Sequence, residues 1–156
     1  MTETRLVTMP ADRLPAWLDT TMAEYVESRM LAGETREQAE ANKQQSLDTW
    51  FPGGTPLDGH HVWDVVDDAD TVVGYLWIGP FTPGSADWWV FNVEVDAAHR
   101  RQGHARRALE AGHRVAKDEG ATSIGLNVFG YNAGAQELYE RLGYGVTAVQ
   151  MKLPLA

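Results

Sequence analysis

The chain contains no cysteine. This absence excludes disulfides, thiolate metal ligands and an acyl-cysteine intermediate, and it suits the reducing cytosol. No apolar run approaches the roughly 18 residues of a membrane span, and no apolar stretch follows the first residues as a signal peptide requires. We therefore expect a cytoplasmic protein that has no membrane partner.

Basic residues are also scarce, with 13 Lys and Arg against 22 Asp and Glu, for a net charge of −9. This balance argues against a general affinity for nucleic acid. Residues 1–78 hold 14 acidic and 5 basic residues, whereas residues 79–156 hold 8 of each. Within the second half, residues 99–107 contain four arginines, two histidines and no acid. This basic cluster indicates either one anionic ligand held at one place or a solvated helix face.

The length of 156 residues predicts a single domain, 1–156. Hydrophobic periodicity and turn residues predict strands at 5–9, 61–67, 71–78, 87–95, 123–128 and 145–153, and helices at 12–32, 35–50, 103–119 and 133–142. The order β-α-α-β-β-β-α-β-α-β is typical of an α/β fold with a mixed sheet and flanking helices. Strand 87–95 is apolar on both faces, so we expect it to be central.

The junction between strand 87–95 and helix 103–119 carries the chemistry. The first turn of a helix offers unpaired N–H groups and partial positive charge. Gly103 and Ala105 are small enough for an anion to approach that backbone, and donors suited to phosphate stand nearby at Arg100, Arg101, Arg106 and Arg107. The pattern predicts a pyrophosphate site. It is not a Walker loop, because no lysine occurs between Lys43 and Lys117.

Two motifs carry a family resemblance. Arg100-x-x-Gly103-x-Ala105 resembles the acyl-CoA signature Gln/Arg-x-x-Gly-x-Gly/Ala of the GNAT superfamily of N-acetyltransferases. The segment 132–144, with Asn132 and Tyr139, is similar to that family's second motif. Two departures, Ala97 for a frequent Pro and Arg101 for a frequent Gly, lie outside the required positions. The resemblance implies a mostly antiparallel, twisted sheet, acetyl-CoA as cosubstrate and no metal; it also suggests a homodimer, although the sequence leaves the oligomeric state open.

The resemblance also implies roles for individual residues. The fourth and fifth strands of the family diverge, and the pantetheine arm of coenzyme A lies in the gap, along the backbone that corresponds to 93–95 here. Tyr139 matches the tyrosine that protonates the departing thiolate. The residues expected to bind the cofactor are Val93, Val95, Arg100, Arg101, Gln102, Gly103, His104, Ala105, Arg106 and Asn132.

Glu94 lies on a strand whose neighbouring residues are mostly Trp, Val and Phe, where burying a carboxylate without a partner is costly. It could be the general base that deprotonates an ammonium, a group that orients the substrate, or a partner in a structural ion pair. Asn92, on the same face, is the next polar candidate. The alternative for Tyr139 is a core aromatic residue of the helix. His60 and His61 are adjacent and show no metal-ligand spacing.

Together these features predict an acetyl-CoA-dependent N-acetyltransferase that acts on an amine of a small molecule or protein by direct transfer in a ternary complex. Two alternatives stay open: a non-enzymatic acyl-CoA-binding or regulatory module, and a nucleic-acid-binding protein that uses residues 99–107. The sequence does not name the acceptor, although the acidic N-terminal half favours a cationic amine.

Overall fold

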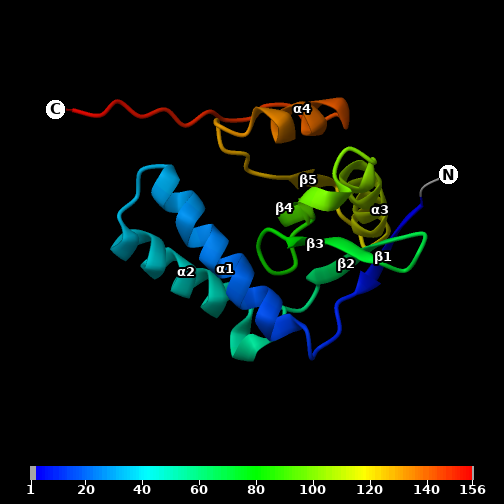
Figure 1. Cartoon of the computed structure of the whole chain (residues 1–156). Helices are drawn as coiled ribbons and strands as arrows, with labels where there is room; N and C mark the ends of the chain where they lie inside the picture. The colour runs from blue at the N-terminus through cyan, green and yellow to red at the C-terminus, as the bar shows by residue number, and fades with distance from the viewer. Residues whose placement is uncertain (1–2, 156) are drawn as a thin grey trace.

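The computed structural model describes residues 3–155 and contains a five-stranded sheet with helices on both faces (Figure 1). The strands follow the order β1-β2-β3-β4-β5; the first four are antiparallel, and β5 is parallel to β4. The strands are β1 (Thr4–Thr8), β2 (His61–Asp67), β3 (Val72–Pro80), β4 (Asp87–Val95) and β5 (Ser123–Gly125). The helices are α1 (Leu14–Leu31), α2 (Arg36–Trp50), α3 (His104–Asp118) and α4 (Ala133–Arg141), with short 3-10 turns η1 (Pro52–Gly54) and η2 (Ala97–His99). The predicted α/β fold with a mixed, mostly antiparallel sheet is confirmed.

Two hydrophobic clusters hold the layers together, one on each face of the sheet. On one face, Leu109 of α3 packs against Leu76 and Val90, and Leu138 of α4 joins this cluster. On the other face, Trp17 and Met22 of α1 pack with Phe51 and Trp77. Since β4 contributes to both clusters, it is covered on both sides, as its apolar sequence predicts. Among residues 3–155, no helix has both the length and the apolar character needed to cross a bilayer.

Local sequence signals place the helix ends. Thr35 Oγ1 accepts from the Gln38 N–H at 3.2 Å, while Gln38 Oε1 accepts from the Thr35 N–H at 2.9 Å, which is the predicted capping box of α2. Gly33 follows α1 with φ of +107°, a left-handed conformation that favours glycine.

The C-terminal part of the fold differs from the prediction in two places. The strand predicted at 123–128 ends at Gly125, because the chain turns away from β4 there. The strand predicted at 145–153 is wrong, since these residues are extended but pair with no strand in the described chain. Alternating apolar residues give a segment strand propensity, but a strand also needs a neighbouring edge, which this segment does not meet.

Candidate active site

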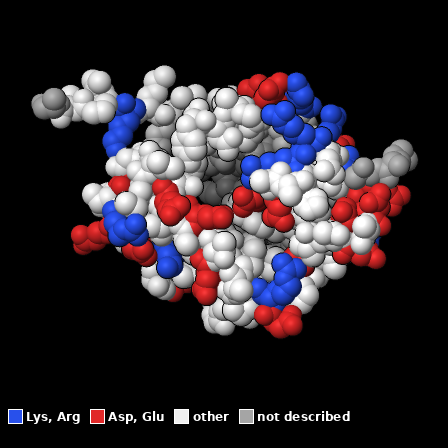
Figure 2. Space-filling model, in the orientation of Figure 1, with Lys and Arg blue, Asp and Glu red and all other residues white. Residues whose placement is uncertain are grey.

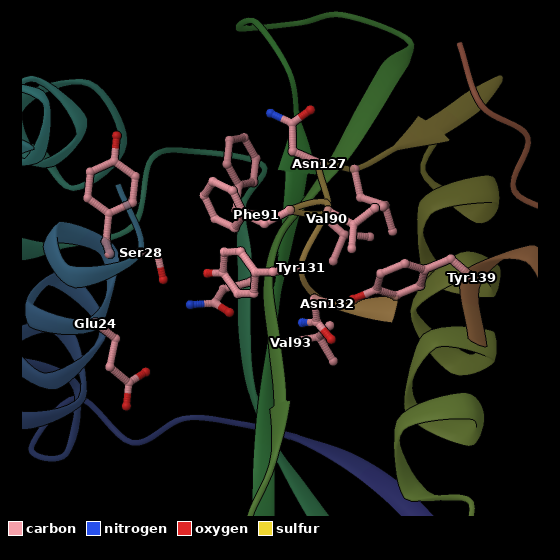
Figure 3. Close-up of a pocket in the computed structure, with 14 residues that line it drawn as sticks. Glu24, Ser28, Val90, Phe91, Val93, Asn127, Tyr131, Asn132 and Tyr139 are labelled. Carbon is pink, nitrogen blue, oxygen red and sulfur yellow. The ribbon is translucent and has the colours of Figure 1, made fainter. Parts of the chain in front are cut away.

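The parallel strands β4 and β5 separate early. Trp89 and Gly125 form the last β4–β5 pair, so the rest of β4, up to Val95, has no partner on the β5 side within residues 3–155. A cavity of about 250 Å³ opens in this gap (Figure 3). Its walls come from α1, from β4 residues 90–93, from residues 126–132 and from Tyr139 of α4.

An irregularity in β4 turns its polar side chains toward α1. Trp77 of β3 pairs with Asn92 but Ile78 pairs with Val90, which leaves Phe91 as an extra residue in β4. Beyond this bulge, Tyr75 lies opposite Glu94. Because residues opposite each other point to the same face and Trp77 packs under α1, Asn92 and Glu94 face α1. As predicted, the two share a face.

The N-terminus of α3 is open to a ligand. Gly103, the residue before the helix, has φ of +81° and provides no side-chain cap. The first bond of the helix runs from the Arg107 N–H to the Gly103 carbonyl at 3.1 Å, so the preceding amides lack an intrahelical acceptor. Arg101 also has a positive φ, +63°, which is uncommon for a residue with a side chain. This turn presents backbone donors as an anion site requires.

The arginines around this turn have different partners. Arg107 has a structural role, because it connects β1 to the loop before α3. Its Nε donates to Thr4 Oγ1 at 2.9 Å, and its Nη2 donates to the Gln102 carbonyl at 2.6 Å. Arg100 Nε donates to the Val95 carbonyl at 2.9 Å. Arg106 forms an exposed ion pair with Glu110 on the next turn. Arg100 and Arg107 thus fix the end of β4 and the loop 100–103 in position.

His104 lies at the helix start but turns away from it. Its side chain is buried, and its Nδ1 lies 2.9 Å from Thr4 Oγ1. Burial lowers the pKa of its imidazole, and the Arg107 charge lowers it further. The ring of His104 therefore does not face a ligand at this turn, and its backbone amide is the part of this predicted cofactor-binding residue that remains available.

Glu94 is held by two neighbours. Tyr75 donates its hydroxyl hydrogen to Glu94 Oε2 at 3.1 Å, and Arg100 Nη2 lies 3.6 Å from Oε1. Burial raises the pKa of the Tyr75 phenol, and the negative charge of Glu94 raises it further, so Tyr75 stays protonated as a donor. The Glu94 side chain is 38% exposed and lies just beyond residues 90–93, the part of β4 that lines the cavity.

Glu24 of α1 is a functional candidate that sequence reasoning missed. It lines the cavity, and its carboxyl group lies near that of Glu94. Partial burial raises the pKa of Glu24, and the charge of Glu94 raises it further. Its spacing from buried Thr21 and from Ser28, three and four residues away, is the available signal that Glu24 faces the sheet.

Asn132 and Tyr139 border the opposite wall. Asn132 precedes α4 as its cap, with Oδ1 accepting from the Ala135 N–H at 3.3 Å. It therefore lies outside the helix body. Both nevertheless line the cavity, and the Tyr139 hydroxyl points toward Asn132 and β4 (Figure 3). Burial raises the pKa of the Tyr139 phenol.

The charges around the cleft are divided. Figure 2 shows a hollow in this face, with basic side chains gathered at its upper right and acidic side chains along its lower rim. The site therefore has one end suited to an anion and another suited to a cation.

The family model "Acetyltransferase (GNAT) family" matches residues 16–144. The chain belongs to the GNAT acetyltransferase family. Its relatives in Bacillus subtilis (strain 168) include two uncharacterized N-acetyltransferases: YycN is 29% identical over 96% of this chain and 97% of its own, and YdgE is 25% identical over 94% and 95%. The crystal structure of YycN superimposes with a TM-score of 0.87, at 27% identity and 99% coverage of both chains. The fold is also that of AAC(6')-Iy in complex with the bisubstrate analog CoA-S-monomethyl-acetylneamine, at a TM-score of 0.59 and 14% identity over 100% of this chain and 99% of the other.

Proposed function

We propose that this GNAT protein transfers the acetyl group of acetyl-CoA directly to a cationic amine, within the cleft where β4 and β5 diverge. One observation carries the proposal: a single cavity joins unpaired β4 backbone, the Tyr139 hydroxyl and the carboxylate of Glu24. These groups are what a thioester, a leaving thiolate and an incoming ammonium require.

The residues at the α3 N-terminus fit the pyrophosphate of coenzyme A. The positive φ of Gly103 turns the chain into α3. The backbone N–H groups that precede Arg107 in the sequence have no hydrogen-bond acceptor within the helix. Amides of Arg101, Gln102, Gly103, His104 and Ala105, with the guanidinium groups of Arg101 and Arg106, are the proposed phosphate ligands. Arg100 would act mainly through its bond to the Val95 carbonyl, which fixes the loop.

The unpaired edge of β4 would hold the pantetheine arm. This arm carries amides, and the backbone from Val93 to Val95 has no β5 partner with which to bond. Asn132 lies across the same cavity, where its side-chain nitrogen is oriented by the bond of Oδ1 to Ala135. Acetyl-CoA would supply an activated thioester carbonyl at this point.

Glu24 and Glu94 would receive the amine. Two neighbouring carboxyl groups attract a cation, and an ammonium would enter as their positive partner. The pair would then take a proton from the ammonium, leaving a neutral amine whose lone pair forms the new C–N bond. Because burial and the neighbouring charge raise the pKa of Glu24, it accepts a proton more readily than an ordinary glutamate does.

Tyr139 would complete the transfer. As the C–S bond breaks, the thiolate needs a proton, and a phenol with a raised pKa remains protonated at neutral pH. The hydroxyl points into the cavity rather than into the core (Figure 3). Tyr139 is therefore the proposed general acid.

A panel of amines incubated with acetyl-CoA tests the proposal, read by free thiol release and by the mass of the product. The panel should pair each cationic amine with a neutral or anionic analogue of similar size. We expect thiol release matched by acetylated amine, at a higher kcat/KM for the cationic members. Tight acetyl-CoA binding without turnover on any amine would instead identify an acyl-CoA-binding module.

A further inference from the structure

Aromatic side chains line the part of the cavity that faces α1. They come from α1, from the β4 bulge and from the loop 126–132, and they are Tyr25, Phe91, Phe129 and Tyr131, which together form the aromatic wall. Figure 3 shows Phe91 and Tyr131 between α1, which carries Glu24, and the opposite side of the cavity, which carries Tyr139. Ligand cavities combine apolar and aromatic walls with a few polar groups that fix orientation. The aromatic wall therefore indicates what an acceptor carries besides its amine.

Phe91 is fixed on the sheet side of the aromatic wall. It is the extra residue of the β4 bulge, and the centre of its ring lies 4.7 Å from that of Trp77 and 4.7 Å from that of Trp50. The residue is only partly buried, and it lines the cavity. Because its aromatic neighbours hold the ring in place, Phe91 offers a ligand a flat surface at little cost in conformational entropy.

Phe129 and Tyr131 leave aromatic surface in water. The centres of their rings are 5.4 Å apart, the ring planes are 6° apart, and the two residues are 40% and 59% exposed. Both line the cavity, so this surface borders the site. Burying aromatic surface against a second ring is favourable beyond the area that it removes from water. A flat apolar ligand in the cavity would supply that second ring.

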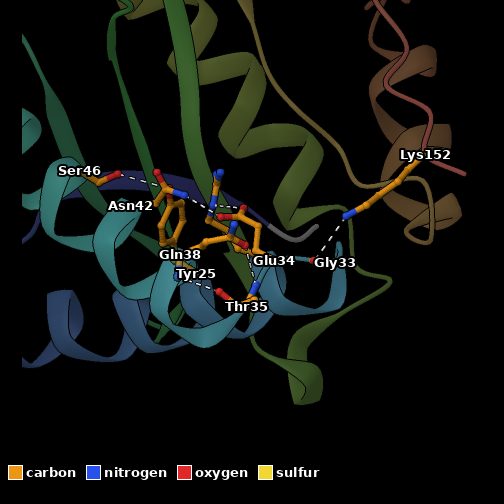
Figure 4. A network of polar contacts seen from close by, with 9 residues as sticks. Tyr25, Gly33, Glu34, Thr35, Gln38, Asn42, Ser46 and Lys152 are labelled. Carbon is orange, nitrogen blue, oxygen red and sulfur yellow. Dashed lines mark hydrogen bonds and ion pairs between the residues drawn. The ribbon is translucent and has the colours of Figure 1, made fainter. Parts of the chain in front are cut away.

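Contacts between α1 and α2 fix Tyr25 and pair the charges beside it. Ser46 of α2 donates to the Tyr25 hydroxyl at 3.5 Å (Figure 4). The Arg29 guanidinium lies 5.3 Å from the centre of the Tyr25 ring, and its Nε pairs with Glu34 at 2.5 Å. Glu34 also accepts from the side-chain nitrogen of Asn42 at 2.7 Å (Figure 4). Since Glu34 is already paired, it does not supply a carboxylate to a ligand beside Tyr25.

The carboxylates that a ligand can meet are gathered at one place. Among the described residues that line the cavity, Glu24 is the only acidic one, and Glu94 lies just beyond the β4 part of the lining. Glu27 is near Glu24 but does not line the cavity. A ligand with one ammonium and one apolar body matches this arrangement. A second ammonium, placed against the aromatic wall, would meet no carboxylate from the described lining.

We propose that the acceptor is a primary arylalkylamine, whose ring packs on the aromatic wall while its ammonium lies beside Glu24. The inference rests on the proposed acetyl transfer. One ammonium proton goes to Glu24 and Glu94 and from there to solvent, and the nitrogen bonds to the acetyl carbon as the C–S bond breaks. The thiolate takes a proton from Tyr139, and the second proton lost by the nitrogen restores the phenol. The product is a neutral amide, which no longer attracts the carboxylates and leaves the cleft.

Steady-state kinetics with four amines tests the substrate class. Phenethylamine has a flat ring and one ammonium, cyclohexylethylamine has a saturated ring, putrescine has a second ammonium in place of a ring, and glucosamine has hydroxyl groups. We expect kcat/KM for phenethylamine to be about tenfold or more above that for putrescine and glucosamine, and several-fold above that for cyclohexylethylamine. An equal or higher kcat/KM for any of these three would overturn the arylalkylamine assignment and leave acetyl transfer itself intact.

Variants locate the bound ring. Phe129→Ala should lower kcat/KM for phenethylamine about tenfold with unchanged acetyl-CoA affinity, and Phe129→Tyr, which keeps a ring, should restore most of it. The matched control is Phe81→Ala. Phe81 is 47% exposed and packs against Trp89, outside the cavity lining, so its removal should leave these kinetics unchanged. Equal kcat/KM values for Phe129→Ala and Phe81→Ala would overturn the proposal.

Calorimetry separates this inference from acetyl transfer. Phenethylamine is titrated into the protein saturated with coenzyme A, which has no acetyl group to donate. We expect binding that Phe129→Ala weakens about tenfold and Phe81→Ala does not. Such binding without acetylation of any amine would refute acetyl transfer while supporting recognition of the arylalkylamine. A wild-type protein that does not bind phenethylamine would overturn that recognition.

Discussion

Tyr75 and Glu94 face each other across the β3–β4 pair, and the Tyr75 hydroxyl donates to Glu94 Oε2 at 3.1 Å. This bond leaves the carboxylate at the cleft margin, where Glu24 of α1 approaches it from the other side. The sheet thus supplies one carboxylate and the helix supplies the other. The proposed amine acceptor would enter between these two groups.

The acidic limb of the pH–rate profile should report this pair. Burial and the charge of Glu94 raise the pKa of Glu24 above its ordinary value of 4.5, so kcat/KM should fall on acidification at a pH above that value. Glu94→Gln removes the neighbouring charge and should move the limb of Glu24 to lower pH. Glu24→Gln should abolish the limb and lower the rate by roughly 10²–10⁴. Asp19→Asn, also on α1, controls for the loss of a negative charge. A limb that stays in place in both glutamine variants would locate the base elsewhere.

Gly103→Val should separate cofactor binding from folding. A β-branched residue at φ of +81° is strained by about 1–2 kcal/mol, and its Cβ would meet the Arg107 guanidinium. Gly120→Val at the other end of α3 carries a similar backbone cost at φ of +98°, with nothing near its Cβ. Calorimetry should show at least a tenfold loss of acetyl-CoA affinity for Gly103→Val alone, with similar losses of thermal stability in both. Equal affinities in two folded variants would refute the pyrophosphate assignment.

His60 should make the fold sensitive to mild acid. Its Nδ1 accepts from the Trp77 indole N–H at 3.0 Å, and burial lowers the pKa of the imidazole from 6.5 to about 4. The unfolded chain therefore takes up a proton at His60 between these values while the folded chain does not, so stability falls as the pH drops from about 6.5 toward 4. His60→Asn keeps an acceptor for Trp77 but cannot titrate. Its melting temperature should fall less steeply over this range than that of the wild type, and parallel curves would contradict the argument.

Sequence reasoning succeeded where the determinant is local. A capping box links Thr35 and Gln38, three residues apart, and the turn at Gly103 follows from small residues at a helix start. That Asn92 and Glu94 share a face could likewise be predicted, because they are two residues apart on one strand; the bulge at Phe91 that turns this face toward α1 could not. In each case the necessary information lies within a few residues of the chain.

What sequence reasoning missed depends on contacts between distant segments. In the sequence, nothing distinguishes Glu24 from the other acidic residues of α1. Its role as a candidate depends on the packing of α1 against the sheet, which brings it near Glu94. The sequence position of His104 is typical of a phosphate ligand, but in the structure its ring is buried and contacts Thr4 on β1. The prediction of a strand at 145–153 is wrong for the same reason. Apolar alternation indicates strand propensity, but it does not determine which sheet edge the segment would pair with.

The proposed function requires that acetyl transfer, and not cofactor binding alone, takes place where β4 and β5 diverge. The most direct measurement compares kcat and acetyl-CoA affinity for Tyr139→Phe and the wild type on an active amine. Tyr144→Phe serves as control, because it also removes a buried hydroxyl, one that binds His113 instead. We predict that Tyr139→Phe lowers kcat by roughly 10²-fold or more with nearly unchanged affinity, while Tyr144→Phe keeps its kcat. Full kcat in Tyr139→Phe would contradict the account.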